Sequence, residues 1–247
     1  MINVRKFKFL RRKSIIGWLL RLPFNLISDN AVIKIPFGPL SGIKWIKGSH
    51  NLSVLLGTYE RSQSRKFREA SEGIQVFWDV GAHAGYYSLL FRSINHAGKV
   101  FAFEPMAKNA TFFRRHMELN SVEGVRLVEK AVSDRDGILR FSSGKTSVAG
   151  KLSVDGDNEV EVVRISRLIS DRIVELPQLI KMDIEGEEYK VLQDLIEWLK
   201  IHKPKMFLST HGENIHKSCV ALLSSIGYTI SPLDSNDLSS CREMYAF

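Results

Sequence analysis

The sequence predicts an α/β fold, with a mostly parallel sheet, helices on both faces and a small amino-terminal extension. Short apolar runs alternate with helical segments of about 10 to 15 residues, a pattern typical of βαβ units. The runs are continuously apolar, as in strands that are covered on both faces of a sheet. The last two runs, 228–233 and 241–247, are joined by a turn-rich link without a helix. That link predicts a closing antiparallel hairpin.

The composition is that of a globular protein with one domain and an extension. The chain has 247 residues, of which 44% are hydrophobic and 25% are charged. The formal net charge is +8, and the segment RKFKFLRRK at 5–13 holds much of the excess. We therefore expect two parts. Residues 1–72 would form a basic amphipathic helix and a small β-rich extension, and residues 73–247 would form the main domain.

The apolar stretch 14–27 follows the basic segment and is interrupted by Arg21 and Pro23. It is too short to span a bilayer, which needs about 20 apolar residues, and it lacks the pattern of a secretory signal. We expect a helix that packs on the main domain of a cytoplasmic protein. Contact of this helix with an anionic membrane surface is the alternative. Cys219 and Cys241 have no partner at ligand spacing, so we expect inert thiols and no zinc site.

The remaining elements follow in order along the chain. Residues 31–60 are predicted to form short strands and turns, and a polar helix leads from there to the main domain. Apolar runs predict strands at 74–80, 100–104, 125–132, 176–183 and 205–210. Helical spacing predicts helices at 86–94, 106–120 and 187–200, and a last helix that ends near Ile226. A β-rich excursion around a polar loop is predicted between the third and fourth of these strands.

The stretch VFWDVGAHAGYY, 76–87, places an acid and a glycine turn at the end of a strand. In open α/β sheets, ligands bind outside the carboxyl ends of the strands, and Gly81 and Gly85 allow the backbone to approach a ligand closely. A dinucleotide turn, G-x-G-x-x-G, would need glycine where His83 stands. Asp79 would repel phosphate but would accept hydrogen bonds from an ammonium group. The turn therefore favours S-adenosylmethionine over NAD.

Glu104 ends the second of these strands, nineteen residues after Gly85. An acid at this place can accept hydrogen bonds from both ribose hydroxyls of a nucleoside. Pro105 also biases Glu104 towards an extended backbone. We therefore predict that Glu104 holds the ribose of the cofactor.

A third acidic cluster, KMDIEGEE at 181–188, follows the fourth of these strands. Glu187 and Glu188 open a helix, where the helix dipole favours acids, so capping explains both. Capping does not explain Asp183 and Glu185. We expect these two carboxylates to face the cofactor cleft together with the acids of the first two strands.

His211 follows the fifth strand and is expected next to Asp183. Methylation of an alcohol needs a base that takes its proton, and Asp183, Glu185 and His211 are the candidate catalytic residues. A neutral imidazole suits this role near neutral pH, whereas a helix-capping histidine is the alternative. Asp183 and Glu185 could also bind a divalent metal, but two carboxylates alone do not favour one, and we assign no metal site. Surface positions are expected for His50, His96, His116, His202 and His216.

Five segments, in this order and spacing, carry a family resemblance: LLGTYE (55–60), DVGAHAGYYS (79–88), FAFEP (101–105), Asn120 with VEKAVSD (128–134), and IKMDIEGEEYKVL (180–192). They resemble the FkbM-type S-adenosylmethionine-dependent methyltransferases. The resemblance implies a class I methyltransferase fold, which is Rossmann-like, with a seven-stranded sheet whose last strand is antiparallel. It also implies O-methylation of a hydroxyl on a sugar, a glycan or a secondary metabolite.

The same resemblance assigns the cofactor site residue by residue. The residues implied at the methionine end of S-adenosylmethionine are Asp79, Gly81, His83 and Gly85. Ala82 and Asp183 are also expected to bind the cofactor. Glu104 would hold the ribose. The adenine would lie by Ala131 and Val132, with Ser133 or Asp134 bonding its edge.

The chain departs from the family pattern at Ile165 and Ser166, where a Leu-Asp pair is common. In the family, the carboxylate of that pair is expected to order the loop before the fourth strand, and this chain lacks it there. The polar loop within 142–158 is individual and is expected to shape the acceptor pocket.

One rival function is a Rossmann-type NAD-dependent oxidoreductase, which His83 disfavours. The other is a nucleic-acid-binding methyltransferase-like protein. RNA methyltransferases of the class I fold often carry an Asn/Asp-Pro-Pro-aromatic motif after the fourth strand, whereas this chain reads DIEG at 183–186. We therefore expect a small-molecule or glycan acceptor and no nucleic-acid partner.

Overall fold

The computed structural model describes residues 26–143, 150–152 and 158–247. The predicted basic helix before residue 26 and most of the polar loop within 142–158 lie outside the described residues, and so does any contact of that helix with a membrane. Within the described ranges, no helix has both the length and the apolar character needed to cross a bilayer.

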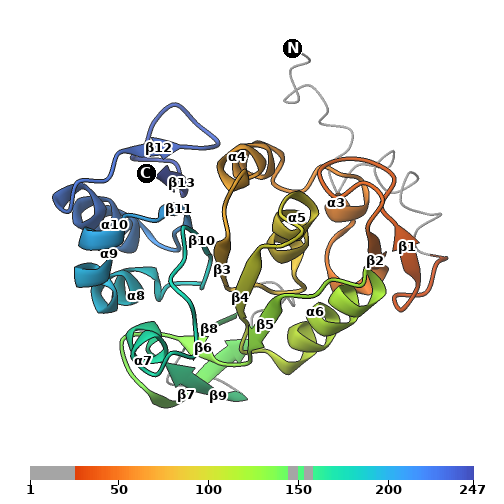
Figure 1. The fold of residues 1–247 in the computed structure, drawn as a ribbon, viewed down its shortest axis with the longest axis horizontal. Coiled ribbons are helices and arrows are strands. Elements are labelled where there is room, and N and C mark those ends of the chain that lie inside the picture. The colour runs from red at the N-terminus through yellow and green to blue at the C-terminus, as the bar shows by residue number, and fades with distance from the viewer. Residues whose placement is uncertain (1–25, 144–149, 153–157) are drawn as a thin grey trace.

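The main sheet has seven strands in the order β12-β13-β11-β10-β3-β4-β5 (Figure 1). Their bounds are β3 (Val76–Val80), β4 (Lys99–Phe103), β5 (Val125–Val128), β10 (Leu179–Met182), β11 (Lys205–Ser209), β12 (Ile230–Pro232) and β13 (Glu243–Ala246). The four pairs from β5 to β11 are parallel, whereas β13 is antiparallel to both β11 and β12. The predicted seven-stranded sheet with an antiparallel last strand is therefore confirmed.

Two hydrophobic clusters cover the two faces of this sheet. One face packs against α4 (Arg61–Ser71), α5 (Tyr86–Ile94) and α6 (Ala107–Leu119), and the other against α7 (Ile165–Ser170), α8 (Glu188–Asp194), α9 (Ile196–His202) and α10 (Glu213–Ser225). Successive strand residues point to opposite faces, so Phe77 joins the first cluster and Trp78 the second. The strands are continuously apolar in the sequence because their side chains pack alternately into the two hydrophobic clusters.

The excursion between β5 and β10 forms a second sheet with the order β6-β9-β7-β8. Its strands are β6 (Ala131–Val132), β7 (Gly137–Ser143), β8 (Gly150–Leu152) and β9 (Asn158–Val163). The predicted single strand at 125–132 is wrong, because β5 pairs with β4 while β6 pairs with β9. The chain therefore changes sheets at residues 129 and 130, which places β6 beside the end of the main sheet.

The predicted helix at 187–200 is also wrong as a single element, since Leu195 separates α8 from α9. At this break the carboxylate of Asp194 accepts hydrogen bonds from the backbone N–H and the hydroxyl of Ser166, at 3.0 and 2.6 Å. Asp194 therefore supplies the carboxylate that the Ile165-Ser166 departure was expected to remove.

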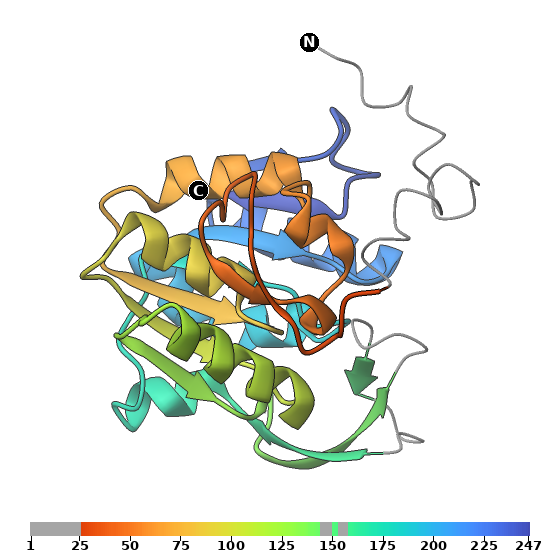
Figure 2. The same ribbon diagram turned by 90° about the vertical axis from the view of Figure 1, so that its right-hand side faces the viewer.

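Residues 26–60 form a small layer against the first cluster. It contains the antiparallel strands β1 (Val32–Lys34) and β2 (Lys44–Ile46), a 3-10 turn (Lys47–Ser49) and α3 (Leu52–Leu55). The layer lies beside α6 and across one face of the sheet (Figure 2). Its side chains share a hydrophobic cluster with α4, α5 and α6. The proposed boundary between residues 72 and 73 stays a prediction.

His116 of α6 joins this layer to the main sheet. Its Nε2 accepts a hydrogen bond from the Ile46 N–H at 2.9 Å, and its Nδ1 lies 2.7 Å from the carbonyl oxygen of Ala84. The ring also stacks on Trp45, with 3.9 Å between centroids. One acceptor and one donor nitrogen define a neutral ring. Burial, the largest influence, lowers the pKa of His116 to about 4.

The expectation of surface positions holds for two of the five histidines, His96 and His202. It is wrong for His116 and His216, which are buried, and for His50, which is partly buried. His216 lies between the Thr210 hydroxyl and the Leu238 carbonyl oxygen. A histidine that bonds backbone groups far away in the chain leaves no signal in its own neighbourhood of the sequence.

We predict that His116→Leu lowers the free energy of unfolding by about 2–4 kcal/mol at pH 7.5, because two buried backbone groups lose their partner. The ordinary histidine pKa is 6.5 and the folded value is about 4. The stabilisation by neutral His116 is therefore complete above pH 6.5 and is lost as the pH falls towards 4. Urea denaturation from pH 4 to 8 measures this difference.

The exposed His96→Leu variant is the matched control, and its stability should track that of the wild type at every pH. A loss in His116→Leu that stays constant from pH 8 to pH 4 would contradict the neutral-ring assignment.

Candidate active site

A cavity of about 550 Å³ opens at the carboxyl ends of β3, β4 and β10. This volume lies in the range of small-molecule sites, roughly 300–1,000 Å³. The sequence-predicted residues that line it are Asp79, Gly81, Ala82, His83, Glu104, Ala131, Val132, Asp183, Glu185 and His211. Residues from six elements or turns thus meet in one place. Gly85 is not among the lining residues.

The two glycines of the turn serve packing. Gly81 has φ +85°, and a Cβ there would overlap the carbonyl oxygen of Asp183. Gly85 has φ +89°, and a Cβ there would lie 2.8 Å from Met117 Cε and 2.9 Å from Phe113 Cδ2. Gly81 therefore lets the turn after β3 meet the turn after β10. Gly85 seats α5 against α6, which differs from its predicted approach to a ligand.

Three residues that line the cavity have positive φ without being glycine: Glu60 at 40°, His83 at 48° and Glu185 at 55°. Such conformations cost roughly 1–3 kcal/mol each and gather at functional sites. Each of the three projects its side chain from a turn into the same cavity. The fold thus maintains local strain where these side chains meet.

Asp79 is buried at the end of β3. Its Oδ2 accepts a hydrogen bond from the Ser88 hydroxyl at 2.6 Å. Burial raises the pKa of Asp79 to about 6, although Ser88 and the charge of Lys181 oppose this change. A cationic ligand at this edge would compensate the buried charge.

Glu104 is held by three N–H donors. Its Oε2 accepts from the backbone of His83 at 2.9 Å, and its Oε1 accepts from the backbone of Met106 at 2.9 Å and from Asn109 Nδ2 at 3.2 Å. A carboxylate has about four lone-pair sites, so this arrangement leaves one on Oε2. Burial raises the pKa of Glu104, against the effect of these donors. One ribose hydroxyl fits the remaining site directly, whereas the sequence predicted two.

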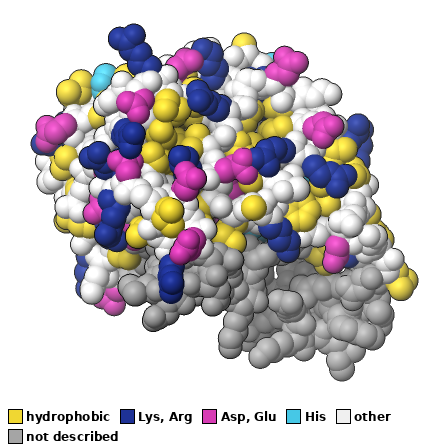
Figure 3. All heavy atoms as spheres, turned by 90° about the horizontal axis from the view of Figure 1, so that it is seen from below, with side chains coloured by type: hydrophobic (Ala, Val, Ile, Leu, Met, Phe, Trp, Pro, Cys, Tyr) yellow, Lys and Arg dark blue, Asp and Glu magenta, His cyan; other side chains and the backbone are white. Residues whose placement is uncertain are grey.

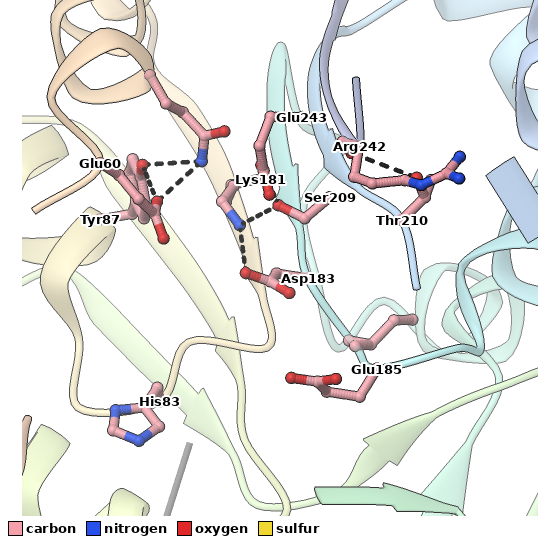
Figure 4. Close-up of polar contacts among 12 residues, drawn as sticks. Glu60, His83, Tyr87, Lys181, Asp183, Glu185, Ser209, Thr210, Arg242 and Glu243 are labelled. Carbon is pink, nitrogen blue, oxygen red and sulfur yellow. Dashed lines mark hydrogen bonds and ion pairs between the residues drawn. The ribbon is translucent and has the colours of Figure 1, made fainter. Parts of the chain in front are cut away.

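Lys181 is a charged side chain within a buried strand, only 3% exposed. Its Nζ donates to Asp183 Oδ2 at 3.1 Å and to Ser209 Oγ at 3.3 Å (Figure 4). Burial lowers its pKa, but the charges of Asp183, Glu60 and Glu243 outweigh burial and raise it overall. Lys181 therefore stays protonated. For Asp183, burial opposes ionisation, yet Lys181 and His211 outweigh it and lower the pKa.

Glu60 and Tyr87 close the same end of the cavity. The Tyr87 hydroxyl donates to Glu60 Oε2 at 2.5 Å, and Gln63 Nε2 donates to the same oxygen at 3.1 Å. The Lys181 ammonium lies 5.2 Å from the centre of the Tyr87 ring. Figure 4 shows Glu60 and Tyr87 on one side of Lys181 and Ser209 on the other. Sequence reasoning missed Lys181, although a lysine inside an apolar strand is a visible signal.

His211 lies among three carboxylates. Its Nε2 is 3.6 Å from Asp183 Oδ1 and 3.4 Å from Glu185 Oε2, and its Nδ1 is 2.8 Å from Glu188 Oε1. Burial lowers the pKa of His211, but the Glu188 hydrogen bond and the nearby carboxylates outweigh it and raise the pKa to about 9. The ring is thus protonated near neutral pH. This corrects the expectation of a neutral imidazole, and the role of base stays a prediction.

Glu188 does more than cap a helix. It is fully buried, and its Oε1 also accepts from the backbone N–H of Gly186 at 3.1 Å and of Ile184 at 3.4 Å. It therefore holds both the turn after β10 and the His211 ring. Its neighbour Glu187 bonds Ser133 Oγ and Lys190. Because Glu187 and Glu188 are adjacent in the sequence, their position at the start of a helix does not show that they bond different partners.

An aromatic wall, also missed in the sequence, completes the cavity. It comprises His50, Tyr59, Tyr86 and Tyr87. The His50 ring lies 4.6 Å from Tyr59 and 5.0 Å from His83, measured between centroids. Burial, followed by the charge of His83, lowers the pKa of His50 to about 4. The LLGTYE segment of the family resemblance contains Tyr59 and is the sequence signal for part of this wall.

The lining is acidic overall. It contains seven carboxylates, namely Glu60, Asp79, Glu104, Asp183, Glu185, Glu187 and Glu243, and three lysines, namely Lys108, Lys130 and Lys181. Such a site favours a cationic ligand over a pyrophosphate.

Comparison with known proteins identifies the family to which this fold belongs. The Methyltransferase FkbM domain matches residues 79–230. The chain belongs to the FkbM methyltransferase family. A solved FkbM methyltransferase from Methylobacillus flagellatus shares the fold, with a TM-score of 0.53 and 18% identity over 80% of this chain and 55% of that chain. The family resemblance and the predicted fold are therefore confirmed.

Two curated relatives of this FkbM-family chain match it more locally. It is 26% identical over 144 residues to the hexuronic acid methyltransferase AglP of Haloferax volcanii, covering 57% of this chain and 58% of AglP. It is 28% identical over 193 residues to the 31-O-demethyl-FK506 methyltransferase FkbM of Streptomyces tacrolimicus, covering 63% of this chain and 73% of that protein. The chain thus spans little more than half the length of AglP and of the solved structure.

We predict that Asp79→Asn stabilises the protein in the absence of ligand, because it removes a buried charge. The ordinary aspartate pKa is 3.8 and the folded value is about 6. The unfavourable term therefore grows as the pH rises from 3.8 to 6 and is constant above. The gain should reach about 2–3 kcal/mol above pH 6, as measured by urea denaturation between pH 4 and 8.

The exposed Asp171→Asn variant should show no such dependence. A gain in Asp79→Asn that is the same at pH 4 and pH 8 would contradict the assignment of a buried, ionised Asp79.

Proposed function

We propose that this chain is an S-adenosylmethionine-dependent O-methyltransferase that acts on a hydroxyl of a sugar, a glycan or a secondary metabolite. The observation that carries the proposal is the meeting of two groups in one acidic cavity. Asp79 and Glu104 lie at the ends of β3 and β4, and the cluster of Asp183, Glu185 and His211 lies at the ends of β10 and β11.

The cavity residues fit S-adenosylmethionine, which supplies an electrophilic methyl group on a sulfonium. The free lone-pair site of Glu104 Oε2 suits a ribose hydroxyl. Ala131 and Val132 offer a buried apolar surface for adenine. Asp79 offers a buried carboxylate for a positively charged group. NAD is a poorer fit, because its pyrophosphate would meet the acidic lining and the side chain of His83.

The three predicted catalytic residues contribute unequally. Asp183 is fixed by Lys181 through Oδ2, so only Oδ1 faces His211. Glu185 and His211 are each about one-third exposed, and both line the cavity. We assign these two to contact with the acceptor hydroxyl and Asp183 to their positioning. Holding the acceptor oxygen in line with the methyl group is the main source of acceleration in such transfers.

The acceptor class takes support from the relatives. One is named for a hexuronic acid and the other for a demethylated FK506, and both names describe methylation. A nucleic-acid partner has less support. Figure 3 shows Lys and Arg interspersed with Asp and Glu over one face, without a continuous basic surface.

The direct test combines binding with transfer. Calorimetry with the purified full chain should detect S-adenosylmethionine, with NAD at the same concentration as the comparison. A labelled methyl donor should then mark an acceptor in extracts of glycans and lipid-linked sugars. Binding of NAD without binding of S-adenosylmethionine would refute the proposal.

We predict that Glu104→Ala weakens S-adenosylmethionine binding at least tenfold, since a buried charge-assisted hydrogen bond to ribose is lost. Calorimetry gives the dissociation constant. Glu118→Ala, on the exposed face of α6, should bind like the wild type. Unchanged affinity in Glu104→Ala would remove the ribose assignment, provided its thermal unfolding still shows a folded protein.

We predict that His211→Ala lowers kcat at least tenfold while the dissociation constant of S-adenosylmethionine changes less than threefold. The imidazole contacts Asp183 and Glu185, and none of the described hydrogen bonds of Glu104 involves His211. Single-turnover methyl transfer and calorimetry separate the two quantities. An equal loss in both would mean that His211 only supports the fold.

A further inference from the structure

We propose that Asp183, Glu185 and His211 form a binding site for a divalent cation such as Mn²⁺ or Mg²⁺. Each residue offers one ligand atom, and the three atoms lie within 4.8 Å of one another. Two are carboxylate oxygens and one is an imidazole nitrogen. The sequence had offered only the two carboxylates; the fold adds His211 from the next strand.

The distances suit one shared ion. His211 Nε2 is 3.4 Å from Glu185 Oε2 and 3.6 Å from Asp183 Oδ1. Ligand atoms about 2.1 Å from one ion lie roughly 3 to 3.6 Å apart when they occupy neighbouring positions. Both distances from His211 Nε2 therefore suit neighbouring positions around one ion, and all three ligand atoms lie within 4.8 Å of one another.

Two surrounding side chains orient these ligands. Glu188 Oε1 accepts from His211 Nδ1 at 2.8 Å, which leaves Nε2 directed at the two carboxylates. Lys181 donates to Asp183 Oδ2, which leaves Oδ1 directed at His211. A carboxylate behind a histidine and a donor behind a carboxylate are the usual supports of metal ligands.

The charge balance also calls for a cation. Glu188 is fully buried, and its Oε2 has no hydrogen-bond partner among the described residues. A buried carboxylate with an unpaired oxygen is unfavourable unless positive charge lies near it. The protonated His211 ring supplies one positive charge, and a divalent ion that binds Nε2 would release that proton and bring two positive charges to the three carboxylates.

The turn after β10 presents Glu185 at an energetic cost. Glu185 has φ +55° and Gly186 has φ +116°. The only polar partner of the Glu185 carboxylate within ion-pair distance in the described part of the chain is His211. Strain that is kept at one side chain of a cluster indicates a ligand role.

The donor set decides the class of ion. Carboxylates favour Mg²⁺, Ca²⁺ and Mn²⁺, whereas an imidazole shifts preference towards transition metals, and Mn²⁺ satisfies both. Three protein ligands leave coordination positions open to the cavity. If the proposed methyl transfer holds, those positions would take the acceptor hydroxyl and lower its pKa, and Glu185 and His211 would then act on the hydroxyl through the ion and not by direct contact.

Mn²⁺ binding to the metal-free full chain, followed by electron paramagnetic resonance and calorimetry, tests the site without any methyl donor. We expect one Mn²⁺ per chain. Asp183→Asn and Glu185→Gln should each weaken the affinity at least tenfold, and Glu188→Gln should weaken it about tenfold. The variant Glu118→Gln, on the exposed face of α6 and outside the cavity, should change it less than threefold.

Binding that is absent at millimolar Mn²⁺ and Mg²⁺, or that survives both Asp183→Asn and Glu185→Gln, overturns the proposal. Glu185→Gln lies on a partly exposed turn, so a folded variant is available for that comparison. Thermal unfolding of each variant without metal establishes that it is folded.

The proposed metal site and the proposed methyl transfer can be tested independently of each other. S-adenosylmethionine binding in excess EDTA reports on the cofactor alone, and Mn²⁺ binding without the cofactor reports on the site alone. Transfer that is lost in EDTA and restored by Mn²⁺ supports a role for the ion in catalysis. Full transfer in EDTA overturns that role, and lost cofactor binding with intact Mn²⁺ binding refutes the proposed function only.

Discussion

The active-site cavity depends on the close approach of two turns, those after β3 and β10. Gly81 makes it possible, because any side chain there would collide with the carbonyl oxygen of Asp183. The parallel pairing of β3 with β10 sets the two turns side by side. A cofactor held by Asp79 and an acceptor held near Asp183 would then be neighbours. Backbone packing thus fixes the distance between the two turns, and with it the distance between the two proposed sites.

Buried charge is the second organising feature, and it links elements that are distant in the chain. Lys181 in β10 contacts Asp183 and Ser209, while Ser209 donates to Glu243 of β13. Burying an isolated ammonium would be costly, so its partners must all be in place in the folded protein. The cavity wall therefore forms only when strands β10, β11 and β13 are assembled together. A network with this property favours one register of the sheet over its alternatives.

The fold could be predicted from the sequence because each strand needed only its own apolar run and the helix beside it. The acids at strand ends could be placed as well, since the carboxyl ends of parallel strands share one edge. The break of the run 125–132 could not be predicted, because the partner of β6 is β9, about thirty residues later. The ring of His116 contacts Ile46 across seventy residues. Contacts of that kind depend on the packing of layers, which no local pattern records.

The position of β13 has a consequence for how the protein is made. This strand lies inside the sheet, between β11 and β12, yet it contains residues 243–246 (Figure 1). During synthesis on the ribosome, β11 and β12 are completed first and must wait for the strand that separates them. Until those residues emerge, the nascent chain exposes an unpaired strand edge, which is prone to aggregate. The same delay withholds Glu243, so the cavity is completed only after β13 has been made.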